Sequence, residues 1–302
     1  MTRLLTPILV ACLALAAWAQ PPSPSPSPSP SPSARPEVGP VKGTLVIVGG
    51  GLKSESILKR FIDLAGGPES SLVLIPTAGE SDDLAEYAAD LRDLQDAGAR
   101  HVRVLHTRDR KVADSDVFVA PLREATGVWL SGGRQWRLAD AYLGTRTHAE
   151  LRGLLARGGV IGGTSAGATI QGSFMVRGDT KGNTLMIGDH VEGLGLIKNV
   201  TIDQHLLKRN RQFDLVPVIE RHPELLGIGI DEDTAIVVRG DRFEVMGSGY
   251  VAIYDHDRRL DSGGPFYFLA PGDRYNLKTR EAERPQMRGA PMERVVNEPW
   301  KK

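Results

Sequence analysis

Short apolar runs that alternate with stretches of helical periodicity constrain the fold of this chain more than any other feature. Leu45–Val48, Leu72–Ile75 and Gly127–Leu130 are almost wholly apolar, and stretches such as Ser54–Ala65 carry apolar residues at helical spacing. Strands buried on both faces have this composition, because none of their residues faces water. The alternation predicts an α/β fold in which helices cover both faces of a mostly parallel sheet, with ligands bound at the carboxyl ends of the strands.

The pattern changes after Leu226. The segments LLGIGID, TAIVVRG, RFEVMG and YVAIYD are short, apolar and separated by Gly and Asp, which predicts β-hairpins that complete the sheet. From Asp273 onward the sequence is polar and aperiodic. We therefore expect one domain over residues 42–272 and a loosely packed polar tail over residues 273–302.

Residues 1–19 have the features of an export signal peptide. Arg3 precedes a mostly apolar run over residues 4–16, and Ala17-Trp18-Ala19 supplies small residues at a cleavage site. A membrane-spanning helix needs about 20 apolar residues, more than this run offers. The features predict a secreted or periplasmic protein. A lipoprotein is the alternative, because the lipobox-like sequence LVAC ends at Cys12, and we expect membrane attachment only if Cys12 is lipidated.

Residues 20–41 form a Pro/Ser-rich linker in this interpretation. The sequence PPSPSPSPSPSPS favours an extended polyproline-type chain, which at about 3.1 Å per residue would span roughly 40 Å. Such a segment would act as a spacer or as a leader without a role of its own, and its composition favours neither.

Charge and cysteine content exclude several classes of function. Lys+Arg and Asp+Glu both number 37, so no overall field attracts nucleic acid, and we expect no nucleic-acid partner. Cys12 is the only cysteine, and cleavage after Ala19 would remove it. The mature chain would then have no disulfide, catalytic thiol or zinc–thiolate site. The spacing of the histidines indicates no metal, and we expect no cofactor.

The stretch GGTSAGA places a serine in a tight turn where an apolar strand meets small residues that can open a helix. Gly163, Ser165 and Gly167 form a Gly-x-Ser-x-Gly arrangement. A nucleophilic serine needs such glycines, because it sits in a strained strand-to-helix turn with no side chains to obstruct the backbone. Taken alone, the motif is compatible with a nucleophile or with a purely structural turn.

A nucleophilic serine also needs a base and an acid that orients the base. His205 is the candidate base, because it lies where a β-branched strand ends in a polar cluster that continues to Arg209 and Arg211. Glu232 is the candidate acid, in GIGIDEDTAI, where three acidic residues end a strongly apolar strand. Each of these residues, taken alone, is also compatible with a surface turn.

In chain order, LSGGRQ, GGTSAGA, DQHLLKRNR and GIGIDEDTA resemble the motifs of the cyanophycinase and aspartyl-dipeptidase (dipeptidase E) family of serine peptidases. The likeness extends over residues 44–254. It implies a three-layer αβα fold akin to class I glutamine amidotransferases, with a Ser-His-Glu catalytic set. The assembly is left open, with a homodimer as one form.

The resemblance assigns roles position by position. Ser165 matches the nucleophile, His205 the general base and Glu232 the acid. The backbone N–H groups of Gly133 and Ala166 match the oxyanion hole. The positions that match the substrate pocket are Gln135, Asp203, Gln204, Arg209 and Arg211.

The pocket arginines point to a substrate with an acidic group, because guanidinium groups pair with carboxylates in bidentate fashion. The resemblance implies an aspartyl peptide or the β-aspartyl-arginine isopeptide bond of a cyanophycin-like polymer, whose guanidinium Asp203 or another pocket acid would receive. Two positions depart from the family's pattern: Arg134 replaces Asn or Asp, and Asp214 replaces a third Arg. Both are recognition positions, so the sequence supports hydrolysis better than cyanophycin specificity.

Three other functions stay open. The first is an α-aspartyl dipeptidase of the same family. The second is an α/β-hydrolase-type esterase, which would need its histidine after its acid, as in Asp231 or Asp233 with His256, and the chain has no His-Gly-Gly-Gly motif. The third is a non-catalytic protein that binds acidic peptides, which would not need a nucleophile, a base and an acid together. The run Gly49-Gly50-Gly51 lacks dinucleotide-site spacing and predicts close backbone packing near the cleft.

Overall fold

The structure is a computed structural model that describes residues 38–258 and 264–285. The expected signal peptide, most of the linker and residues 286–302 of the expected tail lie outside the described residues. Among the residues that are described, no helix has both the length and the apolar character needed to cross a membrane.

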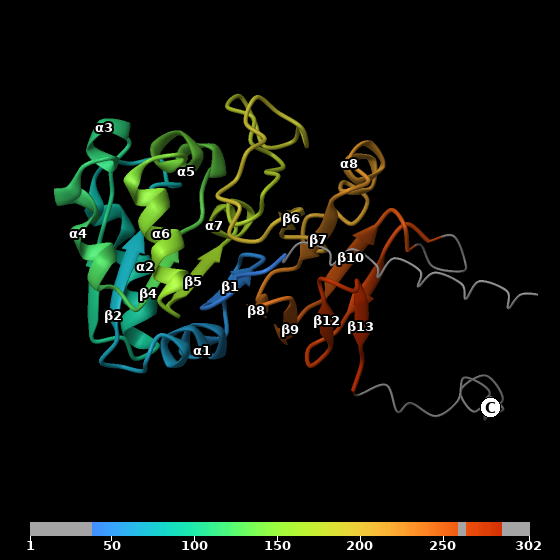
Figure 1. Cartoon of the computed structure of the whole chain (residues 1–302), viewed down its shortest axis with the longest axis horizontal. Helices are drawn as coiled ribbons and strands as arrows, with labels where there is room; N and C mark the ends of the chain where they lie inside the picture. Colours follow the sequence, from blue (N-terminus) through green and yellow to red (C-terminus); the bar gives the residue numbers. More distant parts are fainter. Residues whose placement is uncertain (1–37, 259–263, 286–302) are drawn as a thin grey trace, which may run out of the picture. The chain divides into compact units, whose positions relative to one another are not determined.

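Strand–helix units build the first half of the domain (Figure 1). Five strands run parallel in the order β1-β5-β4-β2-β3, which confirms the predicted parallel sheet. The elements of this half are β1 (Thr44–Val48), α1 (Glu55–Leu64), β2 (Ser71–Ile75), η1 (Leu84–Tyr87), α2 (Ala88–Asp96), β3 (His101–Val104), α3 (Arg110–Ala113), α4 (Asp116–Glu124), β4 (Gly127–Leu130), α5 (Gln135–Tyr142), α6 (Arg146–Ala156), β5 (Val160–Thr164) and α7 (Ala166–Thr169).

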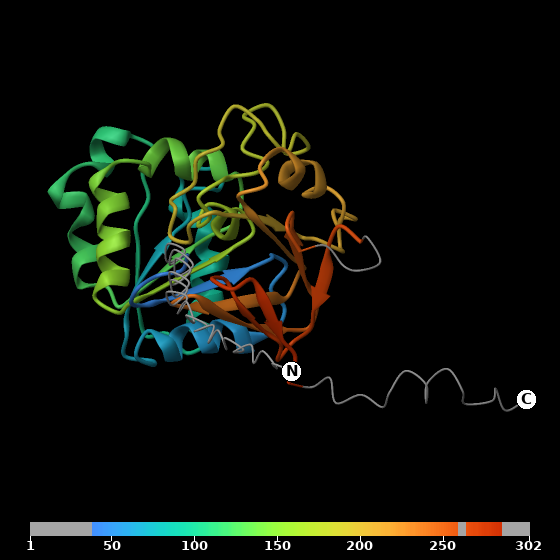
Figure 2. The same cartoon turned by 45° about the vertical axis from the view of Figure 1, so that its right-hand side comes forward.

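Helices cover both faces of this sheet, as the apolar strands require. In β1, Leu45 and Ile47 belong to the core that includes residues of α3 to α7. Val46 and Val48 face the opposite side and pack in the core formed with α1 and α2. Figure 2 shows α1 in blue on one side of the sheet and the green helices on the other. The three-layer αβα fold is thereby confirmed.

Four antiparallel strands extend the parallel sheet to nine strands. β8 (Thr234–Arg239) pairs with β1, and β9 (Arg242–Gly247), β12 (Arg274–Asn276) and β13 (Glu281–Glu283) follow in that order. The β8–β9 pair is one of the predicted C-terminal hairpins, and it completes the sheet as expected.

The other predicted C-terminal strands form a second sheet, which differs from the expectation. β6 (Val200–Gln204) and β7 (Leu226–Ile230) run parallel, and β10 (Val251–Asp255) and β11 (Tyr267–Leu269) continue the sheet in antiparallel pairs. β6, β7 and β10 are buried along their whole lengths, so both faces of this sheet must be covered. One face joins the main core, and α8 (Val216–Arg221) packs with the other.

The domain is longer at both ends than the predicted range of residues 42–272. The expected loose tail is wrong for residues 273–285, because Tyr275 of β12 is buried and its ring stacks on Phe243 at 5.3 Å between centroids. At the other end, the backbone N–H groups of Val38 and Gly39 donate to Asp241 Oδ1 at 2.7 and 3.1 Å. Neither outlying segment is long enough to show a period.

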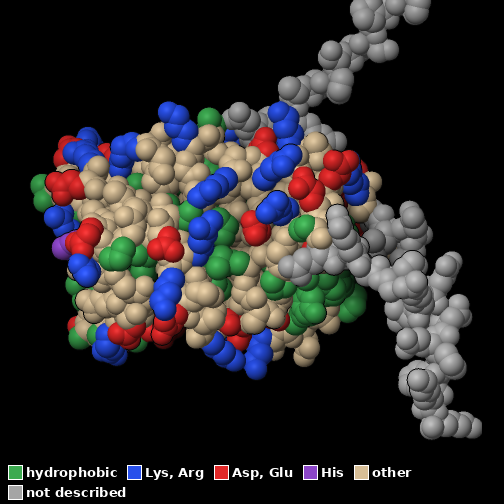
Figure 3. Space-filling view, turned by 90° about the horizontal axis from the view of Figure 1, so that it is seen from below, with side chains coloured by type: hydrophobic (Ala, Val, Ile, Leu, Met, Phe, Trp, Pro, Cys, Tyr) green, Lys and Arg blue, Asp and Glu red, His purple; other side chains and the backbone are tan. Residues whose placement is uncertain are grey.

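The surface mixes both signs of charge. On the face seen from below, Lys and Arg side chains are interspersed with Asp and Glu (Figure 3). This arrangement fits a chain with 37 residues of each sign, and it places any charge selectivity in local features of the molecule.

Candidate active site

Ser165 lies in a strained turn between β5 and α7. Its φ of 55° and ψ of −111° are backbone angles that few non-glycine residues adopt. A Cβ atom on Gly163 would lie 2.3 Å from the Gly167 carbonyl oxygen, and one on Gly167 would lie 2.1 Å from that of Leu130. Close packing of β5, α7 and the end of β4 therefore requires both glycines of the Gly-x-Ser-x-Gly motif.

His205 and Glu232 extend a hydrogen-bonded series that begins at Ser165. The Ser165 Oγ lies 2.9 Å from His205 Nε2, and His205 Nδ1 lies 2.7 Å from Glu232 Oε1. The three residues follow the ends of β5, β6 and β7. The structure thus brings together the side chains that the sequence suggested as nucleophile, base and acid.

The glycine run after β1 makes room for two of these side chains. A Cβ on Gly50 would lie 2.3 Å from His205 Cε1, and a Cβ on Gly51 would lie 2.5 Å from Glu232 Oε2. Both glycines also have positive φ, of 110° and 54°. Any larger residue would displace the imidazole or the carboxylate, so the run provides the close backbone packing that the sequence suggested.

The acids on either side of Glu232 bind backbone instead. Asp231 Oδ1 accepts hydrogen bonds from two N–H groups of the turn after β6, each at 3.0 Å. Asp233 Oδ1 accepts two from N–H groups just before α1, at 3.0 and 2.9 Å. Burial acts to raise the pKa of Asp233, but these hydrogen bonds outweigh it and hold that pKa below its usual value. Of the three acids, Glu232 is the one that contacts His205.

Burial is the main influence on the protonation of His205, whose side chain is only 8% exposed. Burial lowers the pKa of His205, the hydrogen bond to Glu232 acts to raise it, and the charges of Arg209 and Arg211 lower it again. The result is a pKa below the usual value of 6.5. The ring is therefore neutral at pH 7, the state in which a ring nitrogen can accept a proton.

Of the expected oxyanion-hole residues, Ala166 adjoins Ser165 and Gly133 follows a glycine that lies close to it. Ala166 is the next residue and the first of α7. A Cβ on Gly132 would lie 3.4 Å from the Ser165 Cβ and 3.9 Å from its Oγ. Gly133 has φ of 139°, and a Cβ there would lie 2.1 Å from the Ala78 carbonyl oxygen. Glycine at position 132 lets the backbone approach the serine closely, whereas glycine at position 133 is required by close packing against Ala78.

The five expected pocket residues are of two kinds. Gln135, Asp203, Gln204 and Arg211 are buried, whereas Arg209 is exposed. Gln135 Nε2 donates to two backbone carbonyl groups, at 2.8 and 3.0 Å. Arg211 Nη1 donates to the carbonyl and side-chain oxygens of Gln204, at 3.0 and 2.6 Å. The polar groups of these buried residues therefore already form hydrogen bonds within the protein.

Asp203 corrects one expectation of the sequence analysis. Its side chain has no exposed surface, and both oxygens accept hydrogen bonds from Arg177, at 2.8 and 2.9 Å. A carboxylate that already pairs with a protein guanidinium is not free to receive that of a substrate. In this structure Asp203 is a buried carboxylate that binds Arg177.

Sequence reasoning missed Arg177 and treated Arg134 and Asp214 only as departures from a pattern. All three residues are connected to the loop of residues 177–190, which lies between α7 and β6. Arg177 belongs to this loop, and Arg134 and Asp214 contact it. Arg177 Nη2 donates to Asp214 Oδ2 at 2.6 Å. Arg134 Nη2 donates to the carbonyl oxygens of Asp179 and Gly182. A buried Asp at a strand end signals that a cation must lie nearby, but it does not say which of the many arginines pairs with it.

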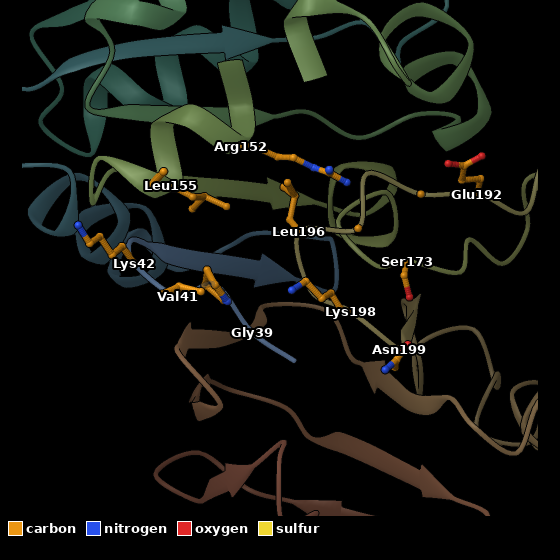
Figure 4. Close-up of a pocket in the computed structure, with 14 residues that line it drawn as sticks. Gly39, Val41, Lys42, Arg152, Leu155, Ser173, Glu192, Leu196, Lys198 and Asn199 are labelled. Atoms are coloured by element: carbon orange, nitrogen blue, oxygen red, sulfur yellow. The ribbon is translucent and has the colours of Figure 1, made fainter. Parts of the chain in front are cut away.

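A hollow of about 900 Å³ lies apart from these residues (Figure 4). Residues 39–42, α6 and the chain just before β6 line it, and its charged side chains are Lys42, Arg152, Lys198 and Glu192. None of the candidate site residues contributes to its wall. The hollow and the hydrogen-bonded series at Ser165 are therefore separate features of the molecule.

Comparisons with known proteins agree on one family. The model of peptidase family S51 matches residues 45–246. The chain is 32% identical over 264 residues to the cyanophycinase of Geminocystis herdmanii, across 80% of this chain and 96% of that protein. It is 33% identical to the cyanophycinase of Synechococcus elongatus, across 80% and 81%. Among solved structures, a peptidase from an acI-B1 Actinobacterium matches with a TM-score of 0.61 and 26% identity, across 79% of this chain and 98% of that one.

Proposed function

The chain belongs to peptidase family S51 and is a serine-type hydrolase similar to cyanophycinases, and we propose that it is an exported peptidase that hydrolyses an aspartyl peptide bond or a β-aspartyl-arginine isopeptide bond. The observation that carries the proposal is the series Ser165–His205–Glu232, with contacts of 2.9 and 2.7 Å between successive side chains. A serine hydroxyl, a neutral imidazole and a carboxylate in this order are the parts that nucleophilic attack on an amide needs.

In the proposed reaction His205 acts first as base and then as acid. His205 Nε2 takes the hydroxyl proton while Ser165 Oγ attacks the carbonyl carbon of the scissile bond. Glu232 accepts the Nδ1–H hydrogen bond, which fixes the tautomer and stabilises the imidazolium. The imidazolium gives its proton to the leaving amine, an acyl-enzyme remains, and water hydrolyses it with His205 again as base.

The oxyanion of the tetrahedral intermediate would accept hydrogen bonds from the backbone N–H groups of Gly133 and Ala166. The Ala166 N–H belongs to the first residue of α7, where a helix leaves its N–H groups without partners inside the helix. The loss of one oxyanion-hole donor costs about 100- to 1000-fold in rate in other hydrolases.

Cations beside His205 support a substrate with a carboxylate. Arg209 is exposed, and the backbone N–H groups of Arg209 and Arg211 donate to the carbonyl oxygens of His205 and Leu206 at 3.0 and 2.7 Å, so both arginines lie in the turn that follows the base. A guanidinium pairs with a carboxylate in bidentate fashion. An aspartyl residue or a free peptide carboxylate would meet this requirement.

The esterase that would use His256 as its base finds no support in the geometry. His256 Nδ1 contacts Asp257 Oδ1 at 3.3 Å on an exposed turn, whereas the hydroxyl of Ser165 contacts His205. A non-catalytic binding protein stays distinguishable by experiment, because it would show no turnover that depends on Ser165.

The test of the proposal is the release of β-aspartyl-arginine from purified cyanophycin by the wild-type chain and by Ser165→Ala. Ser56→Ala is the matched control, because it removes a serine hydroxyl from an exposed position of α1. We expect Ser165→Ala to lose at least about 1000-fold in rate, since the nucleophile is gone, and Ser56→Ala to match the wild type. Turnover that survives in Ser165→Ala would overturn the proposal.

A panel of α- and β-aspartyl dipeptides sharpens the substrate. Cleavage of dipeptides without release from the polymer would identify an aspartyl dipeptidase. Absence of Ser165-dependent turnover on every substrate would favour the binding protein.

Export rests on residues 1–19 and is tested separately. Sequencing the N-terminus of the protein recovered from outside the cytoplasm should give Gln20 as the first residue. A lipid-modified N-terminus at Cys12 would instead establish a lipoprotein, and an intact Met1 on cytoplasmic protein would refute export.

A further inference from the structure

Arg177, which the sequence did not single out, joins three segments around the candidate site. Its side chain is 3% exposed. The guanidinium binds both oxygens of Asp203 at the end of β6, and Nη2 also donates to Asp214 Oδ2 at 2.6 Å in the turn after β6. Nη1 donates to the carbonyl oxygen of Asn183 in the 177–190 loop at 3.0 Å. Arg177 also has φ of 56°, which a non-glycine residue keeps only where its surroundings hold it.

Asp203 has a second arginine nearby. Arg211 Nη1 lies 3.7 Å from Asp203 Oδ1, beyond hydrogen-bond distance, and donates to Gln204 instead. A single carboxylate cannot give two guanidinium groups the same bidentate contact. Because Arg177 makes that bidentate contact, Arg211 stays where its hydrogen bonds to Gln204 hold it. The identity of residue 177 thus bears directly on where Arg211 lies.

From these contacts we propose that Arg177 is a positioning residue of the active site: by pairing with both oxygens of Asp203, it keeps the Arg211 guanidinium at Gln204, where its 9% exposed side chain can meet a substrate carboxylate. The proposal rests on the proposed function, in which Arg211 binds the acidic part of the substrate. Without Arg177, the buried Asp203 carboxylate would lack its partner, which is a costly state. Arg211 would move the short distance to replace it and would be lost to the substrate, while Ser165 and His205 would keep their contact.

Steady-state kinetics of Arg177→Gln test this by the split between KM and kcat. We expect KM to rise about ten-fold or more, the effect of a lost charge-assisted hydrogen bond, with kcat within about three-fold. The double variant Arg177→Gln/Asp203→Asn removes the charge that attracts Arg211, so KM should return most of the way to the wild-type value. Arg177→Lys should lie between, because an ammonium keeps the charge but not the planar fork.

Arg280 supplies a matched control. It also has φ of 56°, and its Nη1 pairs at 2.7 Å with Asp255, another carboxylate without exposed surface. Asp255 pairs with Leu226 at the start of β7, the opposite end of that strand from Glu232. Arg280→Gln should lower the melting temperature as Arg177→Gln does, though it breaks fewer contacts, yet leave KM unchanged. The proposal fails if both variants raise KM alike, or if Arg177→Gln lowers kcat at constant KM.

A crystal structure of Arg177→Gln separates this inference from the proposed function. We expect the Arg211–Asp203 separation to close from 3.7 Å to hydrogen-bond distance, whatever the substrate. An unchanged separation would overturn the inference. A closed pair in a chain whose wild type shows no Ser165-dependent turnover would overturn the proposed function instead.

Discussion

Two histidines contact carboxylates at similar distances in two regions of the molecule. In the candidate site, His205 Nδ1 lies 2.7 Å from Glu232, and its other ring nitrogen faces the Ser165 hydroxyl. In the 177–190 loop, His190 lies between two carboxylates, with Nδ1 2.9 Å from Asp189 and Nε2 2.8 Å from Asp140 of α5. Distance to an acid therefore does not distinguish a candidate base from a histidine that joins two segments.

Burial and the remaining neighbours do distinguish them. The His205 side chain is 8% exposed and that of His190 is 26% exposed. Burial lowers the pKa of His205, and nearby arginines add to that effect. Partial burial acts the same way on His190, but its hydrogen bonds to Asp189 and Asp140 outweigh it and raise the pKa. A histidine between an acid and a hydroxyl can accept the hydroxyl proton and transfer it, whereas a histidine between two acids retains its own proton.

The largest expected difference comes from removing one acid in each region. Glu232→Gln should reduce kcat about 100- to 10,000-fold, because an amide no longer fixes the tautomer of His205 or stabilises its charged form. Asp140→Asn should change kcat by less than about three-fold, since it removes a partly exposed contact of the loop. Kinetics of both variants on the same aspartyl substrate measure the difference. Equal losses of kcat in the two variants would show that the two regions do not differ in their effect on catalysis.

The effects of His205 and His190 on the stability of the fold should depend on pH in opposite directions. The pKa of His205 lies below 6.5, so kcat/KM should fall only as the pH drops below that value, where the base becomes protonated. A lowered histidine pKa also means that acid disfavours the folded state. The pKa of His190 is raised, so its stabilising effect is fully present below pH 6.5 and is lost as the pH rises through the folded-state pKa. Titration of both imidazoles by NMR checks this, and a pKa for His205 above that of His190 would contradict it.

The smallest expected effect is that of His190→Gln. At pH 5 it should lower the free energy of unfolding by no more than about 1 kcal/mol, because solvent screens these partly exposed contacts. At pH 8 the difference from the wild type should be smaller, since the stabilising effect of His190 falls as the pH rises through its raised pKa. Urea unfolding at the two pH values measures it. A loss that grows with pH would show that the ring matters by packing against its neighbour Trp136, whose ring centroid lies 6.1 Å away.

The fold was predictable where local composition determines burial. β1, β2 and β4 are buried along nearly their whole lengths, so their apolar runs indicate strands without knowledge of their neighbours. The choice of partner was not predictable, because β7 and β8 have similar composition but lie in different sheets. β12 escaped detection because a three-residue strand with one buried residue, Tyr275, shows no alternation.

The site was predictable where chemistry restricts the residue type at one position. Ser165, His205 and Glu232 stand out because glycines or a strand end frame each of them. Arg177 does not, because its importance comes from a partner 26 residues away at the end of β6. A buried charge that pairs with a residue far away in the sequence produces no periodic pattern of residues.

The outer strands of the nine-stranded sheet limit how copies of this domain can assemble. β13 carries Glu281 and Glu283, both exposed, and β3 at the other edge carries exposed His101 and Arg103. A second sheet that added its own strand to either edge would have to desolvate these charged groups. Growth of the sheet from one molecule into the next is therefore unfavourable, and contacts through helices or loops are the less costly route to a dimer.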